Sequence, residues 1–267
     1  MNTQKLKMNW WAIIWAVAGL LYFFGPLFGT FDFSMRMVKG QYSFQAYQIV
    51  LADPKFLESF RYSATMGLIT IFVSILIFLP TVYMIHLRLP QIRPVVEIIT
   101  LLPFMIPVIV YVFGLIRTFS RAPFLMTTTP SGTDVLIGAG YIILAMPYMY
   151  RAIDIGMRSI DVRNLTEAAE SLGSNVFHIL LFVILPNLRI ALLSGSLITF
   201  AMVIGELILG DFLFRPALGP YMVLTSGSKA YEPAALAMIS YALTWACLGL
   251  IQLASRGGSS QQQLTGR

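Results

Sequence analysis

The chain has 267 residues, of which 57% are hydrophobic and only 11% are charged. An ordinary soluble domain is about 45–50% apolar and about 25% charged, so this composition excludes a soluble globule, and the excess apolar residues must face lipid or one another. The net charge of +6 does not indicate nucleic-acid binding, because Lys and Arg stand at the ends of apolar runs rather than in one basic patch.

The first apolar run, residues 10–31, follows Lys5 and Lys7 and has the general form of a signal peptide. The triplet Ala16-Val17-Ala18 resembles a cleavage site, but it lies in the middle of the run rather than after it. At about 20 residues the run is long enough to span a bilayer. We therefore expect a retained transmembrane helix.

Five further apolar runs of spanning length follow, each bounded by charged or turn residues. Runs near 20 residues suit helices, whereas the strands of a membrane barrel need only about 10. The sequence therefore predicts an all-α polytopic membrane protein with about six transmembrane helices. The five later spans are expected at residues 62–85, 95–119, 134–152, 189–209 and 234–254.

The distribution of Lys and Arg among the short loops predicts the orientation of these spans. The side that carries the N-terminus has the slight excess, which places both termini in the cytoplasm. The same orientation makes residues 153–187 a cytoplasmic segment of a transmembrane domain over residues 1–255. Residues 256–267 are rich in Gly, Ser and Gln and are expected to form a disordered cytoplasmic tail.

No catalytic signature is present, and we expect no enzyme activity, cofactor or metal in this chain. It has no Gly-rich phosphate-binding loop, so any ATP must be bound by a partner. Cys247 is the single cysteine and is expected to be a buried, inert thiol. His86 and His178 are expected to be satisfied histidines at the membrane edge. A rhomboid-like protease is excluded because the sequence lacks a Gly-x-Ser-Gly motif with a histidine partner.

The cytoplasmic segment 153–187 is too long for a turn, and its pattern predicts a short amphipathic helix. Asp161 is suited to cap the helix N-terminus with its carboxylate. Gly173 is suited to the left-handed conformation that ends a helix. Between them, an apolar stripe falls at positions i, i+3, i+4 and i+7. Its members are Leu165, Ala168, Ala169 and Leu172.

Two acidic residues, Glu167 and Glu170, flank this stripe. A helix that lies on lipid headgroups usually has basic flanks, because an anionic leaflet repels carboxylates. The pattern therefore favours a cytoplasmic protein partner over the membrane surface. After Gly173, Ser174 is expected to cap a second helix that runs to Pro186 along the membrane face.

The same segment resembles the EAA loop of bacterial ABC importer permeases. That pattern is E-A-A, three residues, G, nine residues and I-x-L-P, and it is matched by Glu167-Ala168-Ala169, Gly173 and Val183-Ile184-Leu185-Pro186. Val183 replaces the usual Ile. The resemblance extends to the Pro103/Pro107 pair and to Ala145-Met146-Pro147. Gly205-Glu206 with Asp211-Phe212 is similar to the branch that imports polyamines, iron(III), thiamine and aminoethylphosphonate.

The resemblance implies a multi-pass subunit of the bacterial inner membrane that does not hydrolyse ATP itself. It implies a second permease subunit, two cytoplasmic ATP-binding subunits and an extracytoplasmic substrate-binding protein. The helix near residues 161–172 would dock in a groove of the ATPase. The implied coupling residues are Asp161, Leu165, Glu167, Ala168, Ala169, Leu172, Gly173, Leu185 and Pro186.

Glu206 is an ionisable residue within the expected fifth span, which by default suggests a function. With Gly205 and Asp211 it is a candidate for lining the substrate pathway, and it favours a small cationic or zwitterionic solute such as a polyamine. A carboxylate paired within the protein is the alternative. Iron(III), thiamine and aminoethylphosphonate remain alternative substrates.

Two other classes of protein are less consistent with the sequence. An ATPase-independent carrier or channel commonly shows paired internal repeats, and none is seen. A structural membrane protein would have no need of the acid-flanked cytoplasmic helix.

Overall fold

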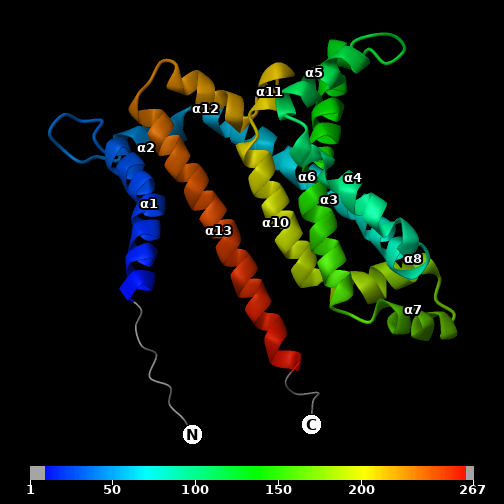
Figure 1. Ribbon diagram of the computed structural model, residues 1–267. Helices are drawn as coiled ribbons and strands as arrows, with labels where there is room; N and C mark the ends of the chain where they lie inside the picture. The colour runs from blue at the N-terminus through cyan, green and yellow to red at the C-terminus, as the bar shows by residue number, and fades with distance from the viewer. Residues whose placement is uncertain (1–9, 263–267) are drawn as a thin grey trace, which may run out of the picture. The chain divides into compact units, whose positions relative to one another are not determined.

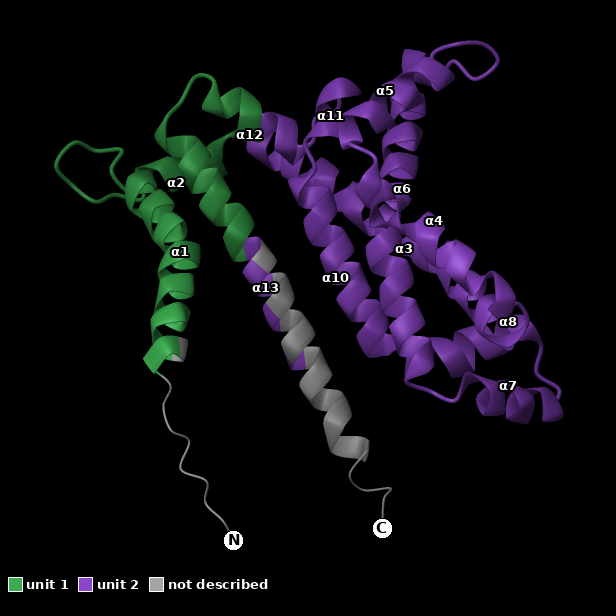
Figure 2. Cartoon of the chain, viewed as in Figure 1, with its two compact units in different colours: residues 1–54, 222–242 green, residues 55–221, 243–267 purple. Residues whose placement is uncertain are grey.

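The structure is a computed structural model that describes residues 10–262, without the side chains of residues 12, 244, 247–248, 250–252 and 254–262. The predicted buried thiol of Cys247 and the tail residues 263–267 therefore lie outside the described residues. Residues 10–262 form helices and turns and contain no strand, which confirms the all-α class. The chain divides into two compact units, one of residues 1–54 and 222–242 and one of residues 55–221 and 243–267 (Figure 2).

The smaller unit contains α1 (Trp10–Ser34), α2 (Gln45–Ala52) and residues 222–242. The rings of Phe33 and Tyr231 stack with 4.8 Å between their centroids. The hydroxyls of Ser34 and Tyr47 are 2.7 Å apart. These contacts hold the end of α1 against α2 and the start of α13 (Tyr231–Gln262).

The larger unit is a bundle in which the short helices of the segment 153–187 lie at one end. In Figure 1, α7 and α8 lie at one end of this unit, and α5 and α11 lie at the opposite end. Its long helices are α3 (Pro54–Leu87), α4 (Arg93–Met105), α5 (Val108–Phe119), α6 (Pro130–Arg158) and α10 (Arg189–Gly205). The shorter elements are α7 (Val162–Ser171), α8 (Val176–His178), a π-helix (Ile179–Ile184), α9 (Leu185–Asn187), α11 (Ile208–Phe212) and the 3-10 turns Pro90–Ile92 and Met126–Thr128. Helix α12 (Leu218–Ser226) begins in this unit, and its residues from 222 onward belong to the smaller one.

Three described helices are long and apolar enough to cross a membrane: Ile13–Ser34, Pro54–Leu87 and Pro130–Arg158. Two bent pairs of helices raise the number to as many as five. The sixth expected span, residues 234–254, is helical as part of α13. Helices α3 and α6 also extend beyond the predicted spans 62–85 and 134–152, because helical hydrogen bonding continues past the apolar residues that signal a span.

The expected span over residues 95–119 is divided into two helices, because the chain bends by 97° between α4 and α5. Pro107 causes the bend. A proline disfavours helical backbone at the residue before it, and Ile106 is accordingly extended, with φ −97° and ψ 120°. Pro107 then precedes the first residue of α5.

Two further boundaries differ from the sequence prediction. The fifth span was expected to be one helix over residues 189–209, but α10 ends at Gly205 and a separate α11 begins at Ile208. Residues 256–262, expected to be disordered, continue α13 as helix through Gln262. A helix that is already formed extends at little cost, because each added residue gains a hydrogen bond.

Small residues bring the end of α6 and the start of α10 close together. A Cβ built on Gly156 would lie 2.7 Å from the Cβ of Ala191. One built on Gly195 would lie 2.8 Å from the Cβ of Ala152. Each helix therefore carries an Ala-x-x-x-Gly pattern at the contact, the arrangement that lets membrane helices approach closely. This contact positions the two helices that flank the segment 159–188.

Candidate coupling site and cytoplasmic cavity

The start of α7 is fixed by Asp161, as the sequence predicted. Its Oδ1 accepts a hydrogen bond from the backbone N–H of Asn164 at 3.1 Å. Its Oδ2 accepts from the side-chain amide of Asn164 at 2.6 Å. The carboxylate thus satisfies one of the backbone donors that a helix N-terminus leaves unpaired.

The end of α7 is fixed by Gly173, whose φ of +80° is in the left-handed region. The N–H of Gly173 donates to the carbonyl of Glu170 at 2.9 Å, and the N–H of Ser174 donates to that of Ala169 at 3.0 Å. This pair of bonds is the Schellman motif. A Cβ at Gly173 would meet nothing within 4 Å, so the position favours glycine for its backbone conformation and not for space.

The apolar stripe predicted on α7 is divided between two faces. The buried residues of the helix are Val162, Thr166 and Ala169, which pack toward the core of the larger unit. Leu165 is half-buried and Ala168 is exposed. Leu172 is 87% exposed. A surface of α7 that includes Ala168 and Leu172 is therefore available for a partner, while Ala169 attaches the helix to its own chain.

A buried hydrogen bond joins α7 to α3. The hydroxyls of Tyr83 and Thr166 lie 3.2 Å apart. Thr166 donates its own proton to the carbonyl of Val162 at 2.7 Å, so Tyr83 is the donor in the bond between the two side chains. The sequence prediction missed Thr166, because a threonine in an apolar stripe gives no signal that it is buried and bonded.

The acidic flanks of α7 point to solvent. Glu167 and Glu170 are both exposed. The Nε of Arg163 donates to Glu167 Oε1 at 2.9 Å, one helical turn away, and this bond raises the pKa of the Arg163 guanidinium. Because both side chains are exposed, water and salt screen this pair, and such pairs contribute little to stability. Glu167 can therefore exchange Arg163 for a basic group of a partner at little cost.

The second short helix of this segment, α8, begins one residue later than predicted. Asn175, rather than Ser174, is its N-cap, and its Oδ1 accepts from the N–H of His178 at 2.8 Å. Ser174 is not available because its backbone completes the Schellman motif of α7. The following residues form a π-helix up to Ile184. Leu185 is half-buried against the core, and Pro186 is exposed.

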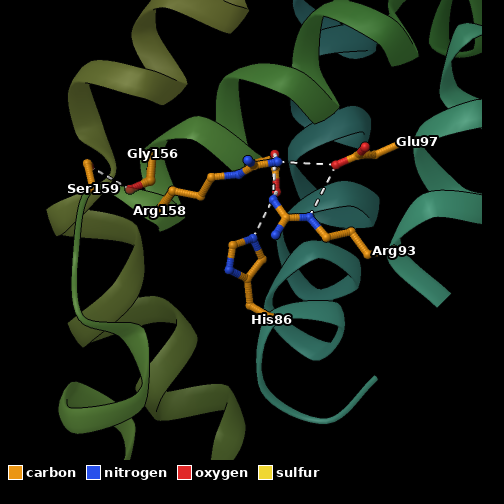
Figure 3. Close-up of polar contacts among 7 residues, drawn as sticks. His86, Arg93, Glu97, Gly156, Arg158 and Ser159 are labelled. Atoms are coloured by element: carbon orange, nitrogen blue, oxygen red, sulfur yellow. Dashed lines mark hydrogen bonds and ion pairs between the residues drawn. The ribbon is translucent and has the colours of Figure 1, made fainter. Parts of the chain in front are cut away.

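A cluster of charged side chains lies at the same end of the unit (Figure 3). Its centre is Asp154, whose side chain is 1% exposed. The carboxylate accepts from His86 Nε2 at 2.8 Å, from Arg93 Nη2 at 3.0 Å and from Arg158 Nη2 at 2.6 Å. Glu97 contacts Arg93 at 3.2 Å and Arg158 at 3.1 Å. The cluster joins α4 and α6 to the end of α3.

This cluster confirms the expectation that His86 is a satisfied histidine. The sequence prediction missed the other members. Arg93 with Glu97 and Asp154 with Arg158 have the i,i+4 spacing of helical ion pairs, which was a usable signal. No group of three or more His, Cys, Asp or Glu side chains in the described part of the chain is arranged to hold a metal ion.

At the opposite end of the unit, Glu206 occupies the break between α10 and α11. Its backbone is extended, with φ −76° and ψ 128°. Its carboxylate accepts from the N–H of Ile208 at 2.8 Å and of Leu209 at 3.0 Å, so it caps the short helix α11. The carboxylate thus has partners within the protein, the alternative that the sequence left open.

The other pathway candidates lie beside this break. Gly205 is exposed, and a Cβ there would meet nothing within 4 Å. Asp211 is exposed on α11. Near the same end, Asp134 forms an ion pair with Arg215 at 2.7 Å and accepts a hydrogen bond from the hydroxyl of Tyr62 at 2.6 Å. These contacts join α3, α6 and the loop after α11. The role of Gly205, Glu206 and Asp211 in the pathway stays a prediction.

A cavity of about 1160 Å³ lies where α6 and α10 approach the segment that contains α7. Residues of α4, α6, α9 and α10 line it, including Phe104, Tyr148, Arg151, Pro186 and Arg189. It borders the close contact between α6 and α10, because Gly156, Ala191 and Gly195 also line it. The two helices α6 and α10 therefore line the cavity and also flank the segment that contains α7.

Residues 90–256 match the family described as "Binding-protein-dependent transport system inner membrane component". The match covers more than half of the chain and includes the coupling helix and the cavity. The chain belongs to this family of ABC importer permeases.

Relatives of this permease are named for different solutes. It is 25% identical over 175 residues to the spermidine/putrescine permease PotB of Haemophilus influenzae, covering 61% of this chain and 60% of the relative. It is 26% identical over 238 residues to the molybdate/tungstate permease WtpB of Pyrococcus furiosus, covering 86% and 91%. It is 28% identical over 149 residues to a putative ferric permease, FbpB 1, of Haemophilus influenzae, covering 56% of this chain but only 22% of the relative.

Solved structures show the same fold. A permease chain of a bacterial ABC transporter involved in the import of the acidic polysaccharide alginate superposes with a TM-score of 0.67 at 14% identity, covering 93% of this chain and 97% of that one. A chain of the MetNI methionine ABC transporter in an inward-facing conformation gives a TM-score of 0.55 at 17% identity, covering 74% and 94%. These likenesses support the polytopic all-α fold.

Proposed function

We propose that this chain is the permease subunit of an ATP-driven importer and that α7 is the contact through which ATP hydrolysis drives it. The observation that carries the proposal is the construction of α7. Both of its ends are fixed, by Asp161 and by the Schellman motif at Gly173. One face is tied to α3 through Tyr83, while Glu167, Ala168 and Leu172 remain exposed.

The partners follow from this arrangement and from the family. A cytoplasmic ATP-binding subunit would cover the exposed surface of α7, with a basic group replacing Arg163 at Glu167. Two such subunits, a second permease subunit and an extracytoplasmic substrate-binding protein would complete the importer in the bacterial inner membrane. Both termini would lie in the cytoplasm, on the side of α7.

The attachment of α7 suggests how force reaches the membrane helices. When the ATPase subunits approach each other, α7 moves with them. Tyr83 passes that movement to α3, and Val162 and Ala169 pass it to the core shared with α6 and α10. The switch between inward- and outward-facing states then needs only a docking energy that differs between the two states.

The substrate is a separate proposal. A small cationic or zwitterionic solute such as a polyamine is supported by the relatives named for spermidine and putrescine and by the exposure of Asp211 beside Glu206. Other relatives are named for ferric iron and for molybdate or tungstate, which differ in charge. Iron(III), thiamine and aminoethylphosphonate therefore remain alternatives.

The coupling proposal is tested by purification of the chain from its native membrane in mild detergent. We expect a nucleotide-binding subunit to co-purify with the wild type and to be lost with Glu167→Lys. Glu58→Lys, a charge reversal at an exposed site on α3, is the matched control and should retain the subunit. Solute uptake by the chain without any ATPase would instead identify a carrier or channel.

The topology is tested in a Cys247→Ser background with single cysteines at Ser131, Ser171 and Ser228, all of which are exposed. An impermeant thiol reagent added to intact cells should label positions 131 and 228 only. Labelling at position 171 would place α7 outside the cell and remove the proposed docking.

A further inference from the structure

The charged residues that line the cavity of the larger unit are both positive. Arg151 of α6 and Arg189 of α10 both line it. None of its lining residues, all of which belong to the described part of the chain, is Asp or Glu. Neither arginine forms an ion pair with any other described residue. Two arginines thus line one cavity without an acidic partner among the described residues.

The nearest acidic residues do not neutralise this cavity. Asp154 follows Arg151 by three residues, but its carboxylate is buried and accepts hydrogen bonds from His86, Arg93 and Arg158. Glu97 is held by Arg93 and Arg158. In the cluster of Figure 3, both nearby carboxylates are therefore already paired with Arg93 and Arg158. What remains at the cavity is uncompensated positive charge.

The other polar groups of the lining suit an oxyanion. The hydroxyls of Tyr148 and Ser194 are potential donors in the wall. The first turn of α10, at Arg189, Ile190 and Ala191, also borders the cavity, and the N-terminal end of a helix dipole favours negative charge. Arginine matches phosphate and carboxylate geometry through two parallel hydrogen bonds. Apolar walls from Leu101, Phe104 and Ile198 leave room for an uncharged remainder.

We propose that this cavity binds an anionic group, of the phosphate, phosphonate, sulfate or carboxylate type, between Arg151 and Arg189. Two sources supply such a group: the headgroup of an anionic membrane lipid, or a solute in transit. The second source rests on the proposed transport function, whereas the first does not. Arginines at the cytoplasmic ends of spans also help to set orientation, so the test uses variants whose insertion is checked.

The first arm of the experiment uses the full chain in neutral detergent and measures thermal unfolding while inorganic phosphate or molybdate is titrated at constant ionic strength. For a solute site we expect saturable stabilisation that is about tenfold weaker in Arg151→Gln and in Arg189→Gln, since a hydrogen bond to a charged group contributes about 1.5–3 kcal/mol. Arg88→Gln is the matched control, because Arg88 is an exposed arginine that does not line the cavity. It should bind as the wild type does.

The second arm places the same proteins in nanodiscs of phosphatidylcholine with or without phosphatidylglycerol and counts retained lipid by native mass spectrometry. Retention of phosphatidylglycerol that is lost in the Arg151→Gln/Arg189→Gln double variant assigns the site to lipid. Binding of the free oxyanion that is lost in the same variant assigns it to a solute. If every anion binds the double variant and the wild type equally, the proposal is overturned.

Co-purification of the ATPase subunit distinguishes a failure of this inference from a failure of the proposed function. The double variant should still co-purify with the nucleotide-binding subunit, because neither arginine lies on α7. Loss of that subunit from the wild type would overturn the coupling proposal and leave the lipid source of the anion site intact.

Discussion

Gly156 of α6 and Ala191 of α10 lie so close that a Cβ on Gly156 would be 2.7 Å from the Cβ of Ala191. Real Cβ atoms essentially never approach this closely. Because both residues are small, the backbones of the two helices that flank the coupling segment can pack directly. This contact also forms part of the wall of the cavity that Arg151 and Arg189 line.

The first prediction follows from this contact. Gly156→Ala should separate α6 and α10 and destabilise the chain by about 1–3 kcal/mol, the usual cost of overpacking. Ala191→Gly combined with Gly156→Ala should restore much of the loss, since it removes the opposing methyl. Gly114→Ala on α5, where a Cβ would meet nothing within 4 Å, is the control. Thermal unfolding in detergent measures all four proteins, and an absence of rescue would contradict the contact.

The second prediction concerns the bond from Tyr83 to Thr166. Tyr83→Phe removes the donor but leaves Thr166 bonded to Val162, so the free energy of unfolding should fall by only about 1 kcal/mol. The attachment of α7 should loosen, with faster hydrogen exchange over residues 162–171 and less transport per ATP hydrolysed by the complex. Tyr22→Phe, at an exposed tyrosine of α1, should change neither. Wild-type exchange in Tyr83→Phe would show that α7 does not depend on this bond.

The third prediction concerns the backbone of Gly173. Its φ of +80° costs an L-residue about 1–2 kcal/mol, although the space around it is open. Gly173→Ala should therefore weaken ATPase association, and Gly173→Asn should weaken it less, because asparagine visits this conformation more readily. Binding of the nucleotide-binding subunit measures the order. Equal losses of binding in Gly173→Ala and Gly173→Asn would mean that the backbone conformation at this position does not control ATPase association.

The fourth prediction concerns the buried carboxylate of Asp154. Asp154→Asn leaves the guanidinium groups of Arg93 and Arg158 without their acceptor charge and should cost about 3 kcal/mol or more, as removal of one partner from a buried ion pair does. Arg158→Gln should cost less, because Arg158 is 48% exposed and water replaces its partner. Thermal unfolding gives the order of the two losses. The reverse order would show that the cluster is not centred on Asp154.

The fifth prediction separates the two roles considered for Glu206. Glu206→Ala removes the cap of α11 and should cost about 1 kcal/mol. Glu206→Gln keeps an oxygen that can accept from Ile208 and Leu209, so it should be nearly as stable as the wild type. Uptake is then measured with this variant at wild-type abundance. A severalfold loss of uptake would mean that the pathway uses the charge, and unchanged uptake would leave Glu206 as a cap alone.

The sequence by itself determined the features that depend on local chemistry. Apolar runs of spanning length required helices, because backbone groups in lipid must be bonded within the segment. Asp161 and Gly173 marked the ends of α7, because capping and positive φ are properties of single residues and their immediate neighbours. The EAA spacing identified the family, which residues 90–256 confirmed.

Only the tertiary structure decided which helix faces are buried and which charged side chains have partners. The periodicity of α7 showed an apolar stripe but not that Ala169 faces the core while Leu172 faces solvent, because burial depends on where α3 and α6 lie. Glu206 looked like an isolated charge in a span until the break after Gly205 gave its carboxylate two backbone donors. Arg151 looked like a marker of orientation, and its place in a cavity with Arg189 depends on the packing of two helices that lie apart in the sequence.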